Sequence, residues 1–192
     1  MNKIFYHHKE GLSFRHLEDK DLDVLAELRT SSWTTTHSML VPTPAQQVKW
    51  FGELQNSNDK LILVAVDESK TDLGIATYHN IDHFNKNLLI GGHVFFPYRK
   101  QGYTTKGWAA GLDFAFEILG MQRVYAEVLE TNLVALKIDT KHLGMVREGV
   151  KRKHIYKCGK WLDSVMLGLL REEWESSDRV KSYGGCCNLD IT

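Results

Sequence analysis

The stretch Phe95-Phe96-Pro97-Tyr98-Arg99-Lys100-Gln101-Gly102-Tyr103-Thr104-Thr105-Lys106-Gly107 decides how this chain is expected to fold. An apolar, strand-like run enters it, and a helix-like pattern leaves it with one apolar face: Trp108, Leu112, Ala115, Phe116 and Leu119. Gly102 has no Cβ, and the first N–H groups of a helix have no intrahelical partner. With positive charge from Arg99 and Lys100, this strand–turn–helix junction predicts a site for a phosphate group.

Two common phosphate-binding loops do not fit this junction. The nucleotide-triphosphate loop requires Gly-x-x-x-x-Gly-Lys-Ser/Thr, which the chain lacks. The dinucleotide loop requires three closely spaced glycines, whereas Gly102 stands alone until Gly107. Two readings therefore stay open, a different phosphate cradle and a basic surface turn ahead of an amphipathic helix.

The segments after the junction narrow the choice. Val124, Ala126 and Val128 alternate with Tyr125, Glu127 and Leu129, which predicts a strand over 122–129. Glu130-Thr131-Asn132-Leu133-Val134-Ala135 follows, and a second helical stretch closes at Leu143-Gly144-Met145. A basic strand, Gly159-Lys160-Trp161-Leu162-Asp163 and a last strand complete the order.

In this order the segments resemble the GNAT superfamily of N-acetyltransferases over about residues 12 to 174. Arg99, Gly102 and Thr104 fall on the fixed positions of the family's pyrophosphate loop, Gln/Arg-x-x-Gly-x-Gly/Ala, and Thr104 departs from it. Asn132 and Ala135 match Asn-x-x-Ala, and the helix after them is one residue longer than is usual. The final segments resemble the ribosomal-protein N-terminal acetyltransferase branch (RimJ/RimL-like).

The remaining patterns predict the rest of an α/β sandwich. Strands are expected at 12–17, 61–66, 73–78 and 88–96, and helices at 18–29 and from Pro44, with Thr43 as its N-cap. The buried faces of these helices are expected to be Leu22, Leu25 and Leu28, and Val48, Phe51 and Leu54. The resemblance implies a mixed, mostly antiparallel sheet with two splayed parallel strands, flanked by helices. Residues 1–176 are expected to form one domain, and 177–192 a polar, flexible tail.

Composition excludes several classes of function. Of 192 residues, 24 are Lys or Arg and 24 are Asp or Glu, so no general attraction to nucleic acid or membranes is expected. Neither a signal peptide nor a membrane-spanning segment is expected from the sequence, and nine scattered histidines predict no metal site. Three cysteines, Cys158, Cys186 and Cys187, make no disulfide framework, which favours the cytoplasm; the role of the last two stays open.

The resemblance implies acetyl-CoA as co-substrate, wedged between the splayed strands. Backbone N–H groups of the cradle would hold the pyrophosphate, the backbone of Phe95 and Phe96 would pair with pantetheine, and Asn132 would lie near the thiol. The expected cofactor-binding set is Phe95, Phe96, Arg99, Lys100, Gln101, Gly102, Tyr103, Thr104, Thr105 and Asn132.

The implied chemistry is direct attack of a neutral amine on the thioester, which needs a base. Glu127 is the first candidate and His93 the second; the alternatives are a solvated sheet residue and a structural histidine. Trp33, His154 and Asp163 are expected to line the acceptor pocket. Residues 135–142 hold no tyrosine, so the usual general acid is missing.

The identity of the acceptor stays open: it is the primary amine of a protein N-terminus or of a small molecule. The alternatives are an amine of a nucleotide-linked sugar, and a regulatory protein that binds acetyl-CoA without catalysis. A polyamine would favour an acidic pocket, for which Glu127 and Glu130 are the available support. The oligomeric state is also open, and a homodimer fits the pattern.

Overall fold

The computed structural model describes residues 4–8, 11–32, 35–37, 42–183 and 188–189. Trp33, Cys186 and Cys187 therefore lie outside the described residues. The strands are β1 (Ile4–His8), β2 (Leu12–His16), β3 (Leu61–Asp67), β4 (Asp72–Asp82), β5 (Asn87–Val94), β6 (Arg123–Leu129), β7 (Val146–Lys157), β8 (Lys160–Leu170) and β9 (Asn188–Leu189). The α-helices are α1 (Leu22–Ser31), α2 (Pro44–Gln55), α3 (Tyr103–Asp113), α4 (Leu133–Lys137), α5 (Arg171–Ser176) and α6 (Asp178–Tyr183).

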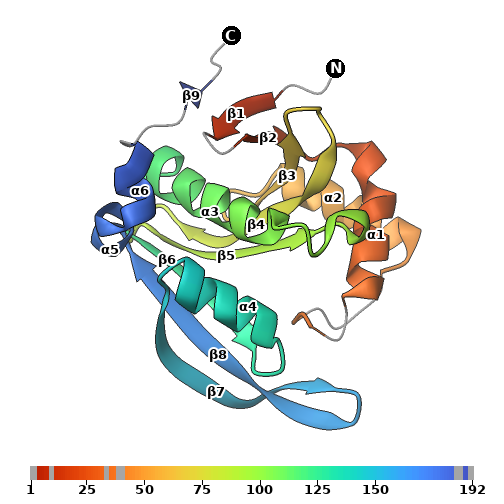
Figure 1. Ribbon diagram of the computed structural model, residues 1–192. Coiled ribbons are helices and arrows are strands. Elements are labelled where there is room, and N and C mark those ends of the chain that lie inside the picture. Colours follow the sequence, from red (N-terminus) through yellow and green to blue (C-terminus); the bar gives the residue numbers. More distant parts are fainter. Residues whose placement is uncertain (1–3, 9–10, 33–34, 38–41, 184–187, 190–192) are drawn as a thin grey trace.

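One sheet of nine strands runs through the molecule in the order β7-β8-β6-β5-β4-β3-β2-β1-β9 (Figure 1). Among the described strands only β5 and β6 pair in parallel, and the other pairs are antiparallel. Alternation along β3 divides the core, because successive strand residues face opposite sides. Leu63 and Ala65 pack with α3, whereas Ile62 and Val64 pack with α1 and α2. The expected α/β sandwich is confirmed.

The start of α2 follows the local sequence, but its buried face does not follow the expected one. Gln46 N–H donates to Thr43 Oγ1 at 3.3 Å, and Thr43 N–H donates to Gln46 Oε1 at 2.9 Å, so the predicted capping box forms. Phe51 is buried, but Val48 is 61% exposed, so its assignment to the core was wrong. Gln47 is buried in its place, because its Oε1 accepts from Arg29 of α1 at 2.9 Å.

Both long helical segments end in a π turn. The helix expected over 104–119 is α3 followed by η3 (Phe114–Ile118), and α4 continues as η4 (Ile138–His142). A π turn takes up one extra residue in a helix. The longer helix after Asn132 is accommodated in this way, and Met145 N–H still closes it by donating to Asp139 O at 2.9 Å.

The two ends of the chain contain elements that the sequence analysis did not assign. The segment before residue 12 forms β1, which pairs with β2 and with β9. The tail expected to be flexible contains α6 and β9, and Val180 of α6 is buried. Both ends are attached to α3 through Asp113, which is fully buried.

Asp113 receives hydrogen bonds from three distant elements. His8 Nε2 of β1 lies 2.7 Å from its Oδ2, and Trp174 Nε1 of α5 donates to its Oδ1 at 2.7 Å. Arg179 of α6 adds two hydrogen bonds, each 2.7 Å long. The carboxylate therefore links the first strand and the last helices to the core.

We expect Asp113→Ala to lower the free energy of unfolding by about 3 kcal/mol or more, because it leaves buried polar partners uncompensated. Urea unfolding of the full chain measures this change. Asp178→Ala, which removes an exposed acid of α6, is the control and should change stability by less than about 0.5 kcal/mol. A change in Asp113→Ala as small as the control's would contradict the role of Asp113.

A second buried acid, Asp139 of η4, lies in an unfavourable environment. Neither of its carboxyl oxygens has a hydrogen-bond partner among the described residues, and burial raises its pKa from 3.8 to about 7. Between pH 3.8 and about 7, the Asp139 carboxyl is therefore protonated in the folded protein and ionised in the unfolded chain. As a result, stability falls as pH rises through this window.

We expect Asp139→Asn to flatten this pH dependence. The difference in unfolding free energy between pH 4 and pH 8 should shrink by up to about 4 kcal/mol, since one pKa unit corresponds to about 1.4 kcal/mol. Urea unfolding at several pH values gives the comparison, with the exposed Asp23→Asn of α1 as control. Parallel pH curves for wild type and Asp139→Asn would show that the buried carboxyl is not the source.

Candidate active site

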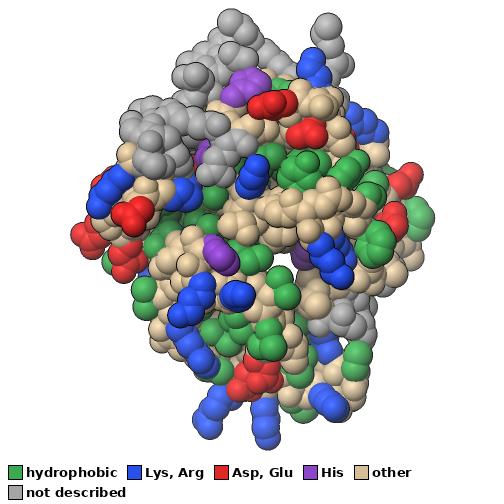
Figure 2. All heavy atoms as spheres, viewed as in Figure 1, with side chains coloured by type: hydrophobic (Ala, Val, Ile, Leu, Met, Phe, Trp, Pro, Cys, Tyr) green, Lys and Arg blue, Asp and Glu red, His purple; other side chains and the backbone are tan. Residues whose placement is uncertain are grey.

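The parallel pair β5–β6 opens into a gap after three residue pairs. Asn87, Leu88 and Leu89 pair with Arg123, Val124 and Tyr125, and there the pairing stops. β5 continues along β4 up to Val94, and β6 continues along β8 up to Leu129. The second half of β5 therefore has no described strand on its β6 side, and Figure 2 shows a hollow between the α3 part and the part formed by α4, β7 and β8.

The predicted cradle corresponds to the turn between β5 and α3. Lys100 and Gly102 both take positive φ values, 64° and 85°, and α3 begins at Tyr103. A Cβ at Gly102 would have no neighbour within 4 Å, so open space lies beside the turn. The first N–H groups of α3 are available there, because the helix itself offers them no acceptor.

Three residues of the predicted cradle, Phe95, Phe96 and Arg99, have other local structure or other hydrogen bonds than expected. β5 ends at Val94; Phe95 N–H donates to Leu73 O at 2.8 Å and Phe95 O accepts from Tyr98 N–H at 3.0 Å. Phe96 starts the 3₁₀ turn η2 (Phe96–Tyr98) and is 72% exposed. The strand predicted over 88–96 is thus too long by two residues, because the proline at 97 favours a turn. Arg99 donates through Nε to Val94 O at 3.2 Å, so it fixes the end of β5.

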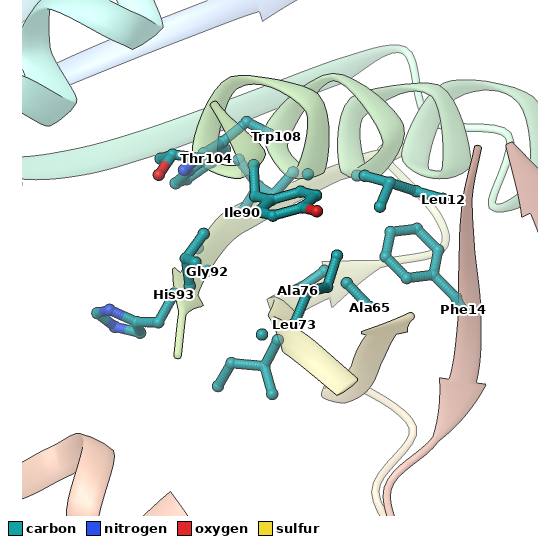
Figure 3. Close-up of a pocket in the computed structure, with 17 residues that line it drawn as sticks. Leu12, Phe14, Ala65, Leu73, Ala76, Ile90, Gly92, His93, Thr104 and Trp108 are labelled. Carbon is teal, nitrogen blue, oxygen red and sulfur yellow. The ribbon is translucent and has the colours of Figure 1, made fainter. Parts of the chain in front are cut away.

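An apolar pocket lies between the first half of α3 and the sheet (Figure 3). Leu12, Phe14, Ala65 and Leu73 form its base, and Thr104 and Trp108 of α3 cover it. The ring of His93 points away from this group of side chains. The pocket therefore offers mainly apolar contact beside the cradle.

Glu127 lies on the opposite face of the sheet, the face covered by α1 and α2. Val124, Ala126 and Val128 are buried toward α3, so Glu127 points the other way. There it forms an ion pair with Lys151 of β7. Lys151 pairs in register with Ser164 of β8, and Ser164 is buried. The first predicted base thus belongs to a polar cluster on the α1–α2 face.

His37 completes this cluster and was missed by the sequence analysis. It belongs to the segment between α1 and α2, and its Nε2 lies 2.9 Å from Ser164 Oγ. Burial lowers its pKa, while the charge of Glu127 acts in the opposite direction. The segment 31–41 has no periodic pattern, so its only sequence signal was the concentration of hydroxyl and aromatic residues beside the histidine.

His93 faces the same side but has the wrong protonation behaviour for a base. It pairs with Ile75, which packs against the α1–α2 layer, so both side chains lie on that face. Burial, aided by the charge of Arg99, lowers the pKa of His93 to about 4. The imidazole is therefore neutral at pH 7 and a weak proton acceptor.

The other predicted acceptor residues are not brought together with Glu127. Asp163 belongs to β8, not to the hairpin turn, and its Oδ1 accepts from Lys153 N–H at 2.7 Å. Glu130 Oε1 accepts from Asp163 N–H at 2.9 Å. Asp163 is next to Ser164 in β8, so its side chain faces the other side of the sheet. Glu130 lies beyond the end of β6 and contacts Asp163 there. His154 is exposed on β7.

Asn132 caps α4 and contacts the α1–α2 segment. Its Oδ1 accepts from Ala135 N–H at 3.2 Å, and its Nδ2 donates to Thr35 O at 3.3 Å. Asn132 therefore links the start of α4 to the segment between α1 and α2 that carries His37.

Two features are absent from the described part of the chain. Within its described ranges no group of three or more His, Cys, Asp or Glu residues is arranged to hold a metal ion. No helix within the described ranges is long and apolar enough to cross a membrane.

Comparison with known proteins gives consistent matches. The sequence model of the acetyltransferase (GNAT) domain matches residues 12–146. The SPbeta prophage-derived uncharacterized N-acetyltransferase YokL of Bacillus subtilis is 27% identical over 172 residues, which is 90% of this chain and 97% of that protein. The "Putative ribosomal N-acetyltransferase YdaF" of the same organism is 26% identical over 182 residues, 86% of this chain and 94% of its own length.

A solved structure shares the fold. The spermidine N-acetyltransferase from Vibrio cholerae, crystallised with CoA and spermine, superposes with a TM-score of 0.81. It is 18% identical in sequence, and the match covers 86% of this chain and 99% of that chain.

We expect the pKa of His37, followed by NMR of its imidazole, to lie below the ordinary value of 6.5 and to fall further in Glu127→Gln. Removing a nearby negative charge makes the protonated ring less favourable. Glu130→Gln is the matched control, because Glu130 lies beyond the end of β6 and accepts from Asp163 N–H instead of Lys151. A rise in the His37 pKa in Glu127→Gln, or equal shifts in both variants, would contradict the cluster.

Proposed function

The chain belongs to the GNAT acetyltransferase family, and on that basis we propose that it transfers an acetyl group from acetyl-CoA to a primary amine. The observation that carries the proposal is the divergence of β5 and β6 after three pairs. It leaves the edge of β5 from Ile90 to Val94 unpaired on the side of β6. This edge follows the one parallel pairing among the described strands. Ligands of open α/β sheets bind at the carboxyl ends of such strands.

The residues around this edge fit the parts of acetyl-CoA. The first turn of α3, with Gly102 and the basic turn before it, suits the pyrophosphate. Because Phe95 already uses its N–H and C=O groups, we assign the contact with pantetheine to the backbone of Ile90 to Val94. Asn132, at the start of α4, remains the proposed neighbour of the thiol end.

The acceptor amine would approach from the α1–α2 face, where Glu127, Lys151, Ser164 and His37 lie. Acetyl-CoA supplies the thioester, and the chain must remove a proton from the ammonium form of the amine. We assign that role to Glu127, which forms an ion pair with Lys151 at the edge of this cluster. Neutral His37 and Ser164 would orient the amine through hydrogen bonds.

The acceptor class is the part that the family leaves open. Similarity to YdaF and the ordered segments at the end of the chain support a protein N-terminal amine, in the cytoplasm. A nucleotide-linked amino sugar is the second candidate, since the α1–α2 segment carries hydroxyl groups and a histidine beside the cluster. A protein that binds acetyl-CoA without catalysis is the third, because no tyrosine lies in 133–142 to protonate the thiolate.

We expect Gly102→Glu to abolish acetyl-CoA binding in calorimetric titration while the thermal transition remains. The carboxylate would lie in the proposed pyrophosphate site and repel it. Gly120→Glu is a matched control, because Gly120 also has a positive φ (66°) and open space around its Cβ position. Equal acetyl-CoA affinity in the two variants would refute the cradle.

We expect Glu127→Gln to lower kcat by about 10² or more and to remove the acidic limb of its pH profile, because a general base contributes about 10²–10⁴. Glu130→Gln serves as the control of equal charge change. Retention of the full pH profile in Glu127→Gln, measured by CoA release from acetyl-CoA with a free amine that the wild type acetylates, would exclude Glu127 as the base.

A further inference from the structure

The far end of the β7–β8 hairpin presents an aromatic surface that no described element covers. On β8, Val165 and Leu167 are buried in the core, and Trp161 alternates in step with them, so it lies on the same face of the sheet. Tyr156 of β7 pairs with Trp161 and shares that face. The hairpin extends past α4 (Figure 1), and there the two side chains are 49% and 59% exposed.

The rings of Tyr156 and Trp161 form one exposed unit. Their centroids lie 5.2 Å apart, with an angle of 55° between the ring planes. Trp174, by contrast, is buried and stacks on Phe116 in the core. Two large rings that stay in water add little to the stability of the fold, and exposed aromatic groups of this kind mark contact surfaces.

Positive charge surrounds the ring pair in a chain that is neutral overall. Residues 133–163, which include α4 and most of the hairpin, contain eight Lys or Arg residues and three acids, whereas the whole chain has 24 of each sign. Figure 2 shows Lys and Arg side chains gathered over the lower part of the molecule, where Figure 1 places α4, β7 and β8.

The three acids of this region do not offset that charge at the surface. Asp139 is buried. Glu148 forms an ion pair with Arg123 at the start of β6. Asp163 accepts a hydrogen bond from Lys153 N–H, a backbone group that leaves the ammonium of the same lysine unneutralised.

Three cations lie beside the rings and are open to a ligand. Arg152, Lys153 and Lys160 are exposed, and no described acid forms an ion pair with any of them. Lys160 directly precedes Trp161. Arg152 and Lys153 belong to an irregular part of β7 that lies opposite Asp163, two positions or about 7 Å along β8 from Trp161.

We infer that this aromatic and basic surface binds single-stranded nucleic acid, with the two rings stacking on bases and the three cations contacting phosphates. Aromatic side chains on an open sheet face are one way in which proteins hold unpaired bases. None of these residues belongs to the proposed acetyl-CoA site or to the cluster around Glu127, so the inference does not depend on the proposed function.

Two other classes of partner fit the surface less well. A membrane would have to take up the rings, but the hairpin turn in front of them carries Cys158, Gly159 and Lys160, and the rings lie behind it on the face of the sheet. An acidic protein surface would neutralise the cations but would not supply flat groups for the rings, as bases do.

Fluorescence anisotropy of a labelled 12-nucleotide oligouridine tests the inference on the full chain. We expect a micromolar Kd at 50 mM salt. The slope of log affinity against log salt should be about −2, because each phosphate contact to a single strand contributes about −0.7. A 12-base-pair RNA duplex, whose bases are not open to stacking, should bind at least about fivefold more weakly. Absence of oligouridine binding up to 100 μM protein, or equal or tighter binding of the duplex, would overturn the inference.

Matched variants assign the binding to the rings. Trp161→Ala should raise the Kd for oligouridine by about tenfold, whereas Trp161→Phe, which keeps a ring, should raise it by less than about threefold. Phe84→Ala removes an exposed ring from the turn between β4 and β5 and is the control; it should leave the Kd unchanged. An equal Kd for Trp161→Ala and Phe84→Ala would contradict stacking at this surface.

A second pair of variants tests the contribution of charge. Lys160→Gln should weaken binding and reduce the salt slope by about 0.7, whereas Lys49→Gln, which removes an exposed lysine of α2, should change neither. An unchanged slope in Lys160→Gln would contradict its contact with phosphate.

Two further probes represent the other classes of partner: a 12-residue polyglutamate peptide and vesicles that contain phosphatidylserine. We expect both to bind more weakly than oligouridine. Tighter binding of either probe, lost in Trp161→Ala, would assign the surface to an acidic protein or to a membrane and overturn the inference.

Discussion

The short parallel pairing between β5 and β6 is the constraint on which the site depends. Three residue pairs join β5 to β6. Beyond them β5 stays paired with β4 and β6 stays paired with β8, so the two strands diverge. The gap cannot close without breaking the longer ladders on either side. An unpaired strand edge generally promotes association with other strands. Here its free N–H and C=O groups are available to pair with the backbone of an extended ligand.

The elements around this gap each supply one chemical property. The turn into α3 offers backbone donors and positive charge on one side of the sheet. The segment between α1 and α2 brings His37 to Ser164 on the other side, next to the Glu127–Lys151 pair. Asn132 links the two by contacting Thr35 while it caps α4. The proposed cofactor side and the proposed acceptor side are therefore separate surfaces that meet at the diverging strands.

The sequence predicted those features whose causes are local. The capping box at Thr43 lies within four residues, and the alternation of β6 follows from burial of one face, so both were predicted and are confirmed. Contacts between distant segments were not predictable: β1 and α6 are held by Asp113, which lies 105 and 66 positions from its partners. Val48 was assigned to the core by helical period alone, whereas the bond from Arg29 to Gln47 fixes the rotation of α2. His37 was missed because its contact with Ser164 spans 127 positions.

Calorimetric titration of the full chain with acetyl-CoA and desulfo-CoA, with NAD as control, tests the central claim most directly. The two CoA compounds share the pyrophosphate and pantetheine parts that the cradle and β5 are proposed to hold. We predict binding of both to one site in the micromolar range and no binding of NAD. No heat with either CoA compound, or equal binding of NAD, would contradict the account.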